Sequence, residues 1–179
     1  MIFPIFDKTL MVTFGLSFLI TLVVTPYWIR RSRKANLVGK DMHKPNKPEV
    51  AELGGLPVVL GFLIGLFAYV AINTFVFDGS ERNIIILAVV LSVLIAAVVG
   101  LIDDILGWKL GLRQWQKPLL TLIAAIPIMV INAGSSVVVL PLFGAVDLGL
   151  VYPLVLIPLA IMGASNGFNM LAGYNGLEA

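Results

Sequence analysis

Two adjacent carboxylates, Asp103 and Asp104, end an apolar run and are the side chains best placed for chemistry. At the C-terminal end of a helix, two acids oppose the helix dipole and repel each other, and a nearby cation relieves both penalties. Successive helical residues point about 100° apart, so the two carboxylates should address different partners, one a metal or phosphate and the other a lysine. Arg113 and Lys117 follow within one loop, although Arg113 is explained more simply as a charge flanking an apolar segment.

Asn166 and Asn169 form a second candidate group, because residues three apart share one face of a helix. Their carboxamides offer neutral oxygen ligands and N–H donors, which suit a hard cation or a diphosphate. Hydrogen bonding between membrane helices explains such asparagines equally well. Gly173 and the pair Asn175-Gly176 then predict a helix end and a turn that brings backbone N–H groups close to a ligand.

The third candidate is the polar loop over residues 40–55, which contains two stiffening prolines. Gly54 and Gly55, followed by Pro57, predict a helix start whose exposed N–H groups form an anion site. His43 is the only histidine, and in a basic loop it is more often a surface residue than a catalyst.

The elements that position these residues are apolar segments long enough to cross a membrane. The chain has 179 residues, of which 59% are hydrophobic and 12% charged, and no cysteine that could form a disulfide. We expect an all-α membrane protein: a single polytopic transmembrane helix bundle of about five spans, with a small external β-hairpin within residues 134–150. The spans are Thr9–Ile29, which is too long for a signal peptide, Gly55–Phe77, Ile84–Ile102, Pro118–Ala133 and Leu150–Ser165.

The basic residues predict the orientation of the chain. Ten of the twelve fall in the two breaks that follow the first and third spans, and only Lys8 and Arg82 fall on the other side. The positive-inside rule therefore places the N-terminus outside and the polar clusters in the cytoplasm, facing membrane lipids. Because these charges interrupt apolar runs instead of covering one soluble face, nucleic acid is not an expected partner.

In these residues the chain resembles the polyprenyl-phosphate N-acetylhexosamine-1-phosphate transferases over essentially its whole length. The strongest element is the run Asn166-x-x-Asn169-x-Leu171-Ala172-Gly173-x-Asn175-Gly176-Leu177-Glu178, with Asp103-Asp104 upstream. Bacterial members usually carry aspartates where Ala172 and Asn175 stand, so the resemblance is to the eukaryotic and archaeal branch. It implies transfer of GlcNAc-1-phosphate from UDP-GlcNAc to dolichyl or polyprenyl phosphate, releasing UMP, as the first step of lipid-linked oligosaccharide assembly.

The resemblance also implies roles for particular residues. Asp103 and Asp104 are similar to the catalytic pair, and Asn169 to an asparagine that binds magnesium, for which manganese can substitute. Lys117 resembles a lysine that contacts the acceptor phosphate, and a homodimer is among the assemblies the resemblance allows. The donor and other substrate contacts fall to Asp41, Met42, Glu52, Asn166 and Asn175, with Lys44, Arg113 and Ser165 as further candidates.

Members of this family have about twice as many spans, and their second half supplies a further magnesium-binding aspartate and a basic motif. We therefore expect residues 1–179 to be the N-terminal half of a ten-span enzyme, inactive alone. The compact loops favour an archaeal cell membrane over the endoplasmic reticulum.

Other classes remain open at this point. A bacterial-type transferase acting on UDP-MurNAc-pentapeptide would share the architecture. If the chain were half of a transporter, ionisable residues would be expected near the bilayer midplane. The predicted spans contain none. A purely structural membrane subunit explains the hydrophobicity but not three polar clusters on one side.

Overall fold

The computed structural model describes residues 8–41, 44–79, 82–106, 115–141 and 144–171, with side chains described up to residue 168. The chain divides into two compact units, Met1–Asn83 and Ile84–Ala179, which we describe in turn.

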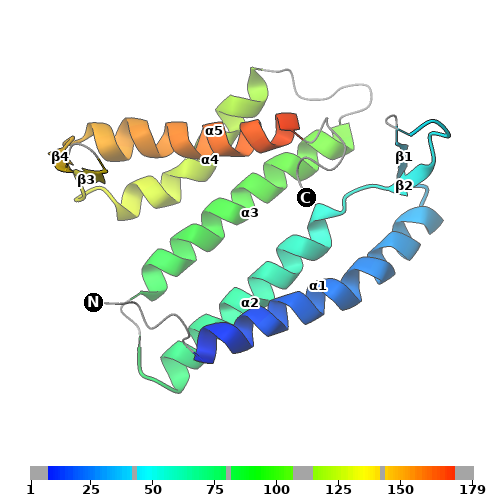
Figure 1. Cartoon of the computed structure of the whole chain (residues 1–179), viewed down its shortest axis with the longest axis horizontal. Coiled ribbons are helices and arrows are strands. Elements are labelled where there is room, and N and C mark those ends of the chain that lie inside the picture. Colours follow the sequence, from blue (N-terminus) through cyan, green and yellow to red (C-terminus); the bar gives the residue numbers. More distant parts are fainter. Residues whose placement is uncertain (1–7, 42–43, 80–81, 107–114, 142–143, 172–179) are drawn as a thin grey trace. The chain divides into compact units, whose positions relative to one another are not determined.

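The first unit is a pair of long helices, α1 (Lys8–Lys34) and α2 (Gly55–Phe75), which lie side by side (Figure 1). Large apolar side chains cover their outer surfaces, as on Phe14, Val23 and Phe75. Exposing so large an apolar surface to water is energetically unfavourable, whereas contact with lipid tails is not.

Small residues let the two helices approach closely. Gly61 and Gly65 of α2 are buried against α1, and a Cβ atom on Gly65 would stand 2.7 Å from the Cβ of Ser17. A Cβ on Gly61 would overlap the hydroxyl of Thr21 and stand 2.9 Å from the carbonyl oxygen of Ser17. Close contact between small residues four apart is a common way to pack helices in a membrane, where burying apolar surface gives no advantage.

Helix α1 ends in a Schellman motif. Asn36 adopts φ +56°, the Leu37 N–H donates to the Ser32 carbonyl at 2.9 Å, and the Asn36 N–H donates to the Arg33 carbonyl at 3.3 Å. The turn leads into a short antiparallel hairpin of β1 (Val38–Lys40) and β2 (Glu49–Ala51). The sequence analysis predicted no strands here, because three-residue strands show too little hydrophobic alternation.

The second unit begins with α3 (Asn83–Leu106), which leads to α4 (Gln116–Ile131). Next comes a hairpin of β3 (Val137–Leu140) and β4 (Gly144–Asp147), paired from Val137↔Asp147 to Leu140↔Gly144, which confirms that residues 134–150 form a hairpin. A π-helical turn, η1 (Tyr152–Leu156), and α5 (Ile157–Leu171) complete the unit.

Helices α4 and α5 pack side by side (Figure 1). Ala124 and Ala125 are almost fully buried, as is Pro153 of η1, and small side chains again permit close packing. Pro127 lies inside α4 without ending it, and α1 likewise runs through Pro26.

The helices confirm a membrane protein of the predicted class, a bundle of apolar helices. Three of them, α1, α2 and α3, are long and apolar enough to cross a membrane. The fourth and fifth predicted spans are shorter apolar helices: α4 has 16 residues, which at 1.5 Å per residue reach about 24 Å of the roughly 30 Å hydrocarbon layer.

Candidate active site

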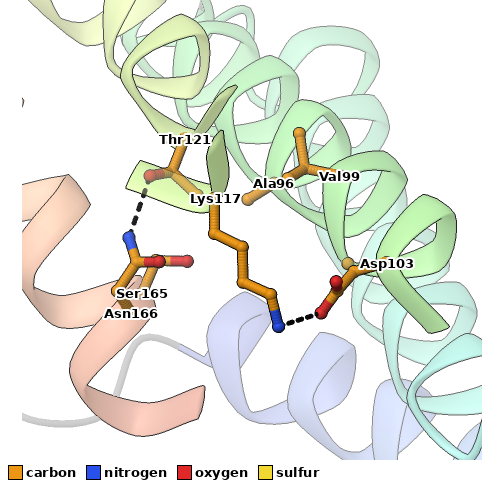
Figure 2. Close-up of a pocket in the computed structure, with 8 residues that line it drawn as sticks. Ala96, Val99, Asp103, Lys117, Thr121, Ser165 and Asn166 are labelled. Atoms are coloured by element: carbon orange, nitrogen blue, oxygen red, sulfur yellow. Dashed lines mark hydrogen bonds and ion pairs between the residues drawn. The ribbon is translucent and has the colours of Figure 1, made fainter. Parts of the chain in front are cut away.

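An ion pair joins two of the predicted site residues, which lie in different helices. The Lys117 Nζ atom, in the first turn of α4, lies 2.6 Å from the Asp103 Oδ2 atom near the end of α3 (Figure 2). The Asp103 side chain is 14% exposed and that of Lys117 is 32% exposed. Each charge opposes the dipole of its own helix, so pairing offsets both penalties. The expectation that one carboxylate faces a lysine is thereby confirmed.

The carboxylates of Asp103 and Asp104 lie in different surroundings, as the helical geometry predicts. Asp103 lines a cavity with Lys117, whereas the Asp104 side chain is exposed at the end of α3. Asp103 is thus the member of the pair that faces the other site residues.

Asn166 in α5 is bonded across to α4. Its side-chain amide donates to the Thr121 hydroxyl at 3.0 Å and to the Met162 carbonyl at 2.8 Å, and the Thr121 hydroxyl lies 2.9 Å from the Pro118 carbonyl, to which it donates (Figure 2). Thr121 is only 5% exposed. Asn166 therefore makes the interhelical hydrogen bond that was the alternative to ligand binding, and this bond fixes its carboxamide near Lys117.

These residues surround one small cavity between α3, α4 and α5. Its volume is about 50 Å³, which accommodates water or part of a phosphate group, whereas a nucleotide sugar is too large for it. The polar part of the wall comes from Asp103, Lys117, Thr121, Ser165 and Asn166, and the apolar part from Ala96, Val99 and Gly100.

The predicted residues of the first unit lie on its hairpin. Asp41 follows β1, where its carboxylate is 3.1 Å from the Lys44 ammonium and its N–H donates to the Pro48 carbonyl at 3.0 Å. Asp41 and Lys44 are thus brought together as an ion pair, with Lys44 the more exposed partner.

Glu52 occupies the other end of the same hairpin. Its N–H donates to the Leu37 carbonyl at 3.1 Å, and its own carbonyl accepts a 3.2 Å bond from the Trp28 indole. Its carboxylate lies over Gly39, where a Cβ atom would stand 2.7 Å from Oε1. Leu37 and Asp41 are four strand residues apart, about 13 Å, so the hairpin keeps Glu52 and Asp41 at opposite ends.

The structure describes only the backbone of one predicted site residue and does not describe three others. Helix α5 runs through Asn169, one turn after Asn166, as predicted, but the Asn169 side chain is not among those described. Met42, Arg113 and Asn175 lie outside the described residues.

Sequence analysis missed the part that Thr121 plays in the site. A sequence signal was present, because Thr121 is four residues after Lys117 and therefore on the same face of α4. Gly39 carried no comparable signal, because only the hairpin brings it under Glu52.

The sequence profile of glycosyl transferase family 4 matches residues 86–179, more than half of the chain. The chain belongs to this family. The matched region contains the cavity residues Asp103, Lys117, Thr121 and Asn166.

Individual relatives of this family 4 protein carry the names of two transfer reactions. A Saccharolobus solfataricus protein with the provisional name UDP-N-acetylglucosamine–dolichyl-phosphate N-acetylglucosaminephosphotransferase is 39% identical over 90% of the chain and 47% of its own length. A Dictyostelium discoideum protein of the same name is 31% identical over 89% of the chain and 42% of its own length. The phospho-N-acetylmuramoyl-pentapeptide-transferase of Streptococcus mutans is 30% identical over 92% of the chain and 51% of its own length. The chain spans about half the length of these relatives.

Carboxylate oxygens at the end of α3 could contribute to a magnesium site. No group of three His, Cys, Asp or Glu side chains converges within the parts of the chain described above. Magnesium is commonly bound by one or two carboxylates together with substrate phosphates and water. Asp104 at the end of α3 can supply such a carboxylate, while Asp103 is paired with Lys117.

Proposed function

We propose that this protein contributes to the transfer of GlcNAc-1-phosphate from UDP-GlcNAc to dolichyl or another polyprenyl phosphate, with release of UMP. The archaeal and Dictyostelium relatives named for this reaction support the proposal, as does the resemblance of the asparagine motif to the eukaryotic and archaeal branch. The activity would be that of the full-length enzyme.

The observation that carries the proposal is the ion pair at the cavity. Attack of a lipid phosphate on a diphosphate brings anions together, so a cation must offset their repulsion. The Lys117 ammonium is 32% exposed, which leaves part of it open to an incoming phosphate while Asp103 holds it in place. Lys117 would then bind the acceptor phosphate, and Asp103 would position Lys117.

The chemistry requires little proton transfer from the protein. A phosphate nucleophile is already ionised at neutral pH, so the reaction needs positioning and charge compensation. In this proposal Asp103 orients the lysine, and Asn166, held by Thr121, contributes a polar contact at the cavity.

Magnesium, with manganese as a substitute, completes the proposal. Asn169, as the family resemblance implies, and Asp104 would hold it together with the diphosphate oxygens. When bound, the metal would withdraw charge from the diphosphate and orient it.

Nucleotide sugars are made in the cytoplasm, so we place the site there and the N-terminus outside, in an archaeal cell membrane. The basic last turn of α1, with Arg31, Arg33 and Lys34, agrees with a cytoplasmic end of that helix.

A transfer assay with radiolabelled UDP-GlcNAc tests the function. Residues 1–179 are assayed alone and joined to the second half of the Saccharolobus solfataricus relative, with dolichyl phosphate and magnesium. We expect labelled lipid from the joined protein, inhibition by tunicamycin, and little product from residues 1–179 alone.

The donor used in the assay decides between the branches of the family. A joined protein that transferred only from UDP-MurNAc-pentapeptide would contradict the proposed donor and assign the chain to the reaction named for the Streptococcus mutans relative. The joined protein with Lys117→Met in residues 1–179 serves as the control of low activity.

A further inference from the structure

A second cavity lies in the first unit, and none of its wall residues is assigned to the transfer reaction. It is formed where the chain turns out of α1, and its volume is about 360 Å³, within the range of about 300–1,000 Å³ that ligand sites occupy. Its wall consists of Trp28, Arg31, Ser32, Lys34, Ala35 and Leu37.

The cavity carries two positive charges that no acid offsets in the parts of the chain that the structure describes. Arg31 and Lys34 are both exposed, and the salt bridges of the described residues join other pairs, Asp41 with Lys44 and Asp103 with Lys117. The carbonyl groups of residues 31–33 already accept hydrogen bonds from the N–H groups of residues 35–37, so the two cations are not needed to cap these carbonyls.

Ser32 supplies a second and independent indication of a ligand. Its side chain is 2% exposed, and its hydroxyl has no hydrogen-bond partner among the described residues. A buried hydroxyl without a partner is destabilising, so a missing acceptor is expected nearby. Ser32 lies between Arg31 and Lys34 in the sequence and is part of the cavity wall. An oxygen atom of an anion bound there could accept a hydrogen bond from its hydroxyl.

The position of the cavity indicates which anion is available. Helix α1 is apolar enough to cross a membrane, and the cavity lies at its basic end, which belongs at the level of the lipid headgroups. Trp28, whose indole N–H is bonded to the Glu52 carbonyl, adds the amphipathic ring that is typical of this depth.

We propose that this cavity binds the phosphate group of an anionic membrane phospholipid, with Arg31 and Lys34 neutralising the charge and Ser32 donating a hydrogen bond. The bound lipid would fix the junction between α1 and the β1–β2 hairpin. The inference does not depend on the transfer reaction, because its test measures lipid binding and uses none of the proposed active-site residues.

The test compares two double variants in the same turn of α1. Arg31→Gln with Lys34→Gln removes the charges in the cavity, and Arg30→Gln with Arg33→Gln removes equal charge from exposed residues outside it. Native mass spectrometry of the detergent-solubilised chain, titrated with phosphatidylglycerol, measures retained lipid. We expect affinity to fall roughly tenfold or more in the cavity variant and less than about threefold in its control.

Ser32→Ala keeps the charges and tests the hydroxyl. Without lipid it should raise the Tm, because it removes a buried hydroxyl that lacks a partner, whereas the rise in Tm on adding phosphatidylglycerol should become smaller than in the parent chain. An unchanged response to phosphatidylglycerol would contradict the role of Ser32.

Four further results would overturn the proposal. Equal loss of phosphatidylglycerol from both double variants would show diffuse attraction, and no loss from either would show that the cavity binds no lipid. Stronger retention of dolichyl phosphate than of phosphatidylglycerol, or displacement of the lipid by equimolar inorganic phosphate, would assign the cavity to a substrate or a soluble anion.

Discussion

At the scale of single residues, the site depends on two polar links that cross between helices. One is the ion pair of Asp103 with Lys117, and the other is the hydrogen bond from Asn166 to Thr121. Both lie among apolar helices, where water competes weakly for polar groups, so losing one partner leaves the other poorly compensated.

The ion pair gives the first prediction. In the joined enzyme, Lys117→Met should lower transfer about 100-fold, because no cation remains to offset the phosphates, whereas Lys117→Arg should retain much more activity. Initial rates with UDP-GlcNAc and dolichyl phosphate measure the effect. If Lys117→Met and Lys117→Arg were equally active, the lysine would have no role in binding the acceptor.

The hydrogen bond gives the second prediction. Thr121→Val removes the acceptor that fixes the Asn166 amide and should lower both the thermal stability, by about 0.6 kcal/mol, and the transfer rate; Thr121→Ser should restore both. Thr25→Val is the matched control, because the Thr25 hydroxyl bonds only within α1, to the Thr21 carbonyl at 2.7 Å. A loss of the same size in Thr25→Val would remove the case for a positioning role.

At the scale of elements, small side chains and short turns decide how the helices meet. Helix α2 approaches α1 through glycines, and α4 meets α5 through Ala124 and Ala125. Each hairpin closes a connection between two helices, so its geometry determines where the polar loop residues lie.

The contact of α1 with α2 gives the third prediction. Gly65→Ala should destabilise the chain by about 1–3 kcal/mol, because its Cβ would press on Ser17 and on the Thr13 carbonyl, 2.9 Å away. Gly15→Ala is the control, since a Cβ there meets nothing within 4 Å. The free energy of unfolding of each variant is measured in mixed micelles. Equal stability of the two variants would contradict this packing.

The β3–β4 hairpin gives the fourth prediction, on pH. The Gly149 N–H, 3.0 Å from Asp147 Oδ1, and then the Ser136 side chain hold the pKa of Asp147 below its usual value. Because the folded-state pKa is the lower one, this carboxylate supports the hairpin above the unfolded-state pKa, and the support is lost as pH falls through the folded-state value. NMR titration should find a depressed pKa that rises in Ser136→Ala; an ordinary value in the parent chain would contradict the Gly149 contact.

At the scale of the whole molecule, the proposed function requires the polar ends of the helices to face the cytoplasm. The distribution of basic residues supports this orientation, and the enzyme must meet a soluble nucleotide sugar and a lipid phosphate at the same membrane surface.

The orientation gives the fifth prediction. The chain has no cysteine, so single cysteines report position without background. In intact cells a membrane-impermeant maleimide should label Ser136→Cys in the external hairpin and should label Asp104→Cys only after permeabilisation. Labelling of Asp104→Cys but not of Ser136→Cys in intact cells would reverse the orientation and exclude a cytoplasmic site at Asp103.

The sequence by itself determined the class of the protein and most of its helices. Long apolar runs can satisfy their backbone groups in lipid only as helices, so hydropathy alone located the apolar helices and the polar ends that carry Asp103 and Asn166. The β-branched run followed by a glycine likewise predicted the β3–β4 hairpin. The structure gives Gly144 a φ of +72°, which glycine adopts readily.

Only the tertiary structure decided which polar groups meet. The pairing of Asp103 with Lys117, the bond of Asn166 to Thr121 and the place of Glu52 over Gly39 depend on how helices and strands pack side by side. Hydropathy measures the preference of a segment for lipid over water, a local property, whereas these contacts arise from the shapes of surfaces distant in the sequence.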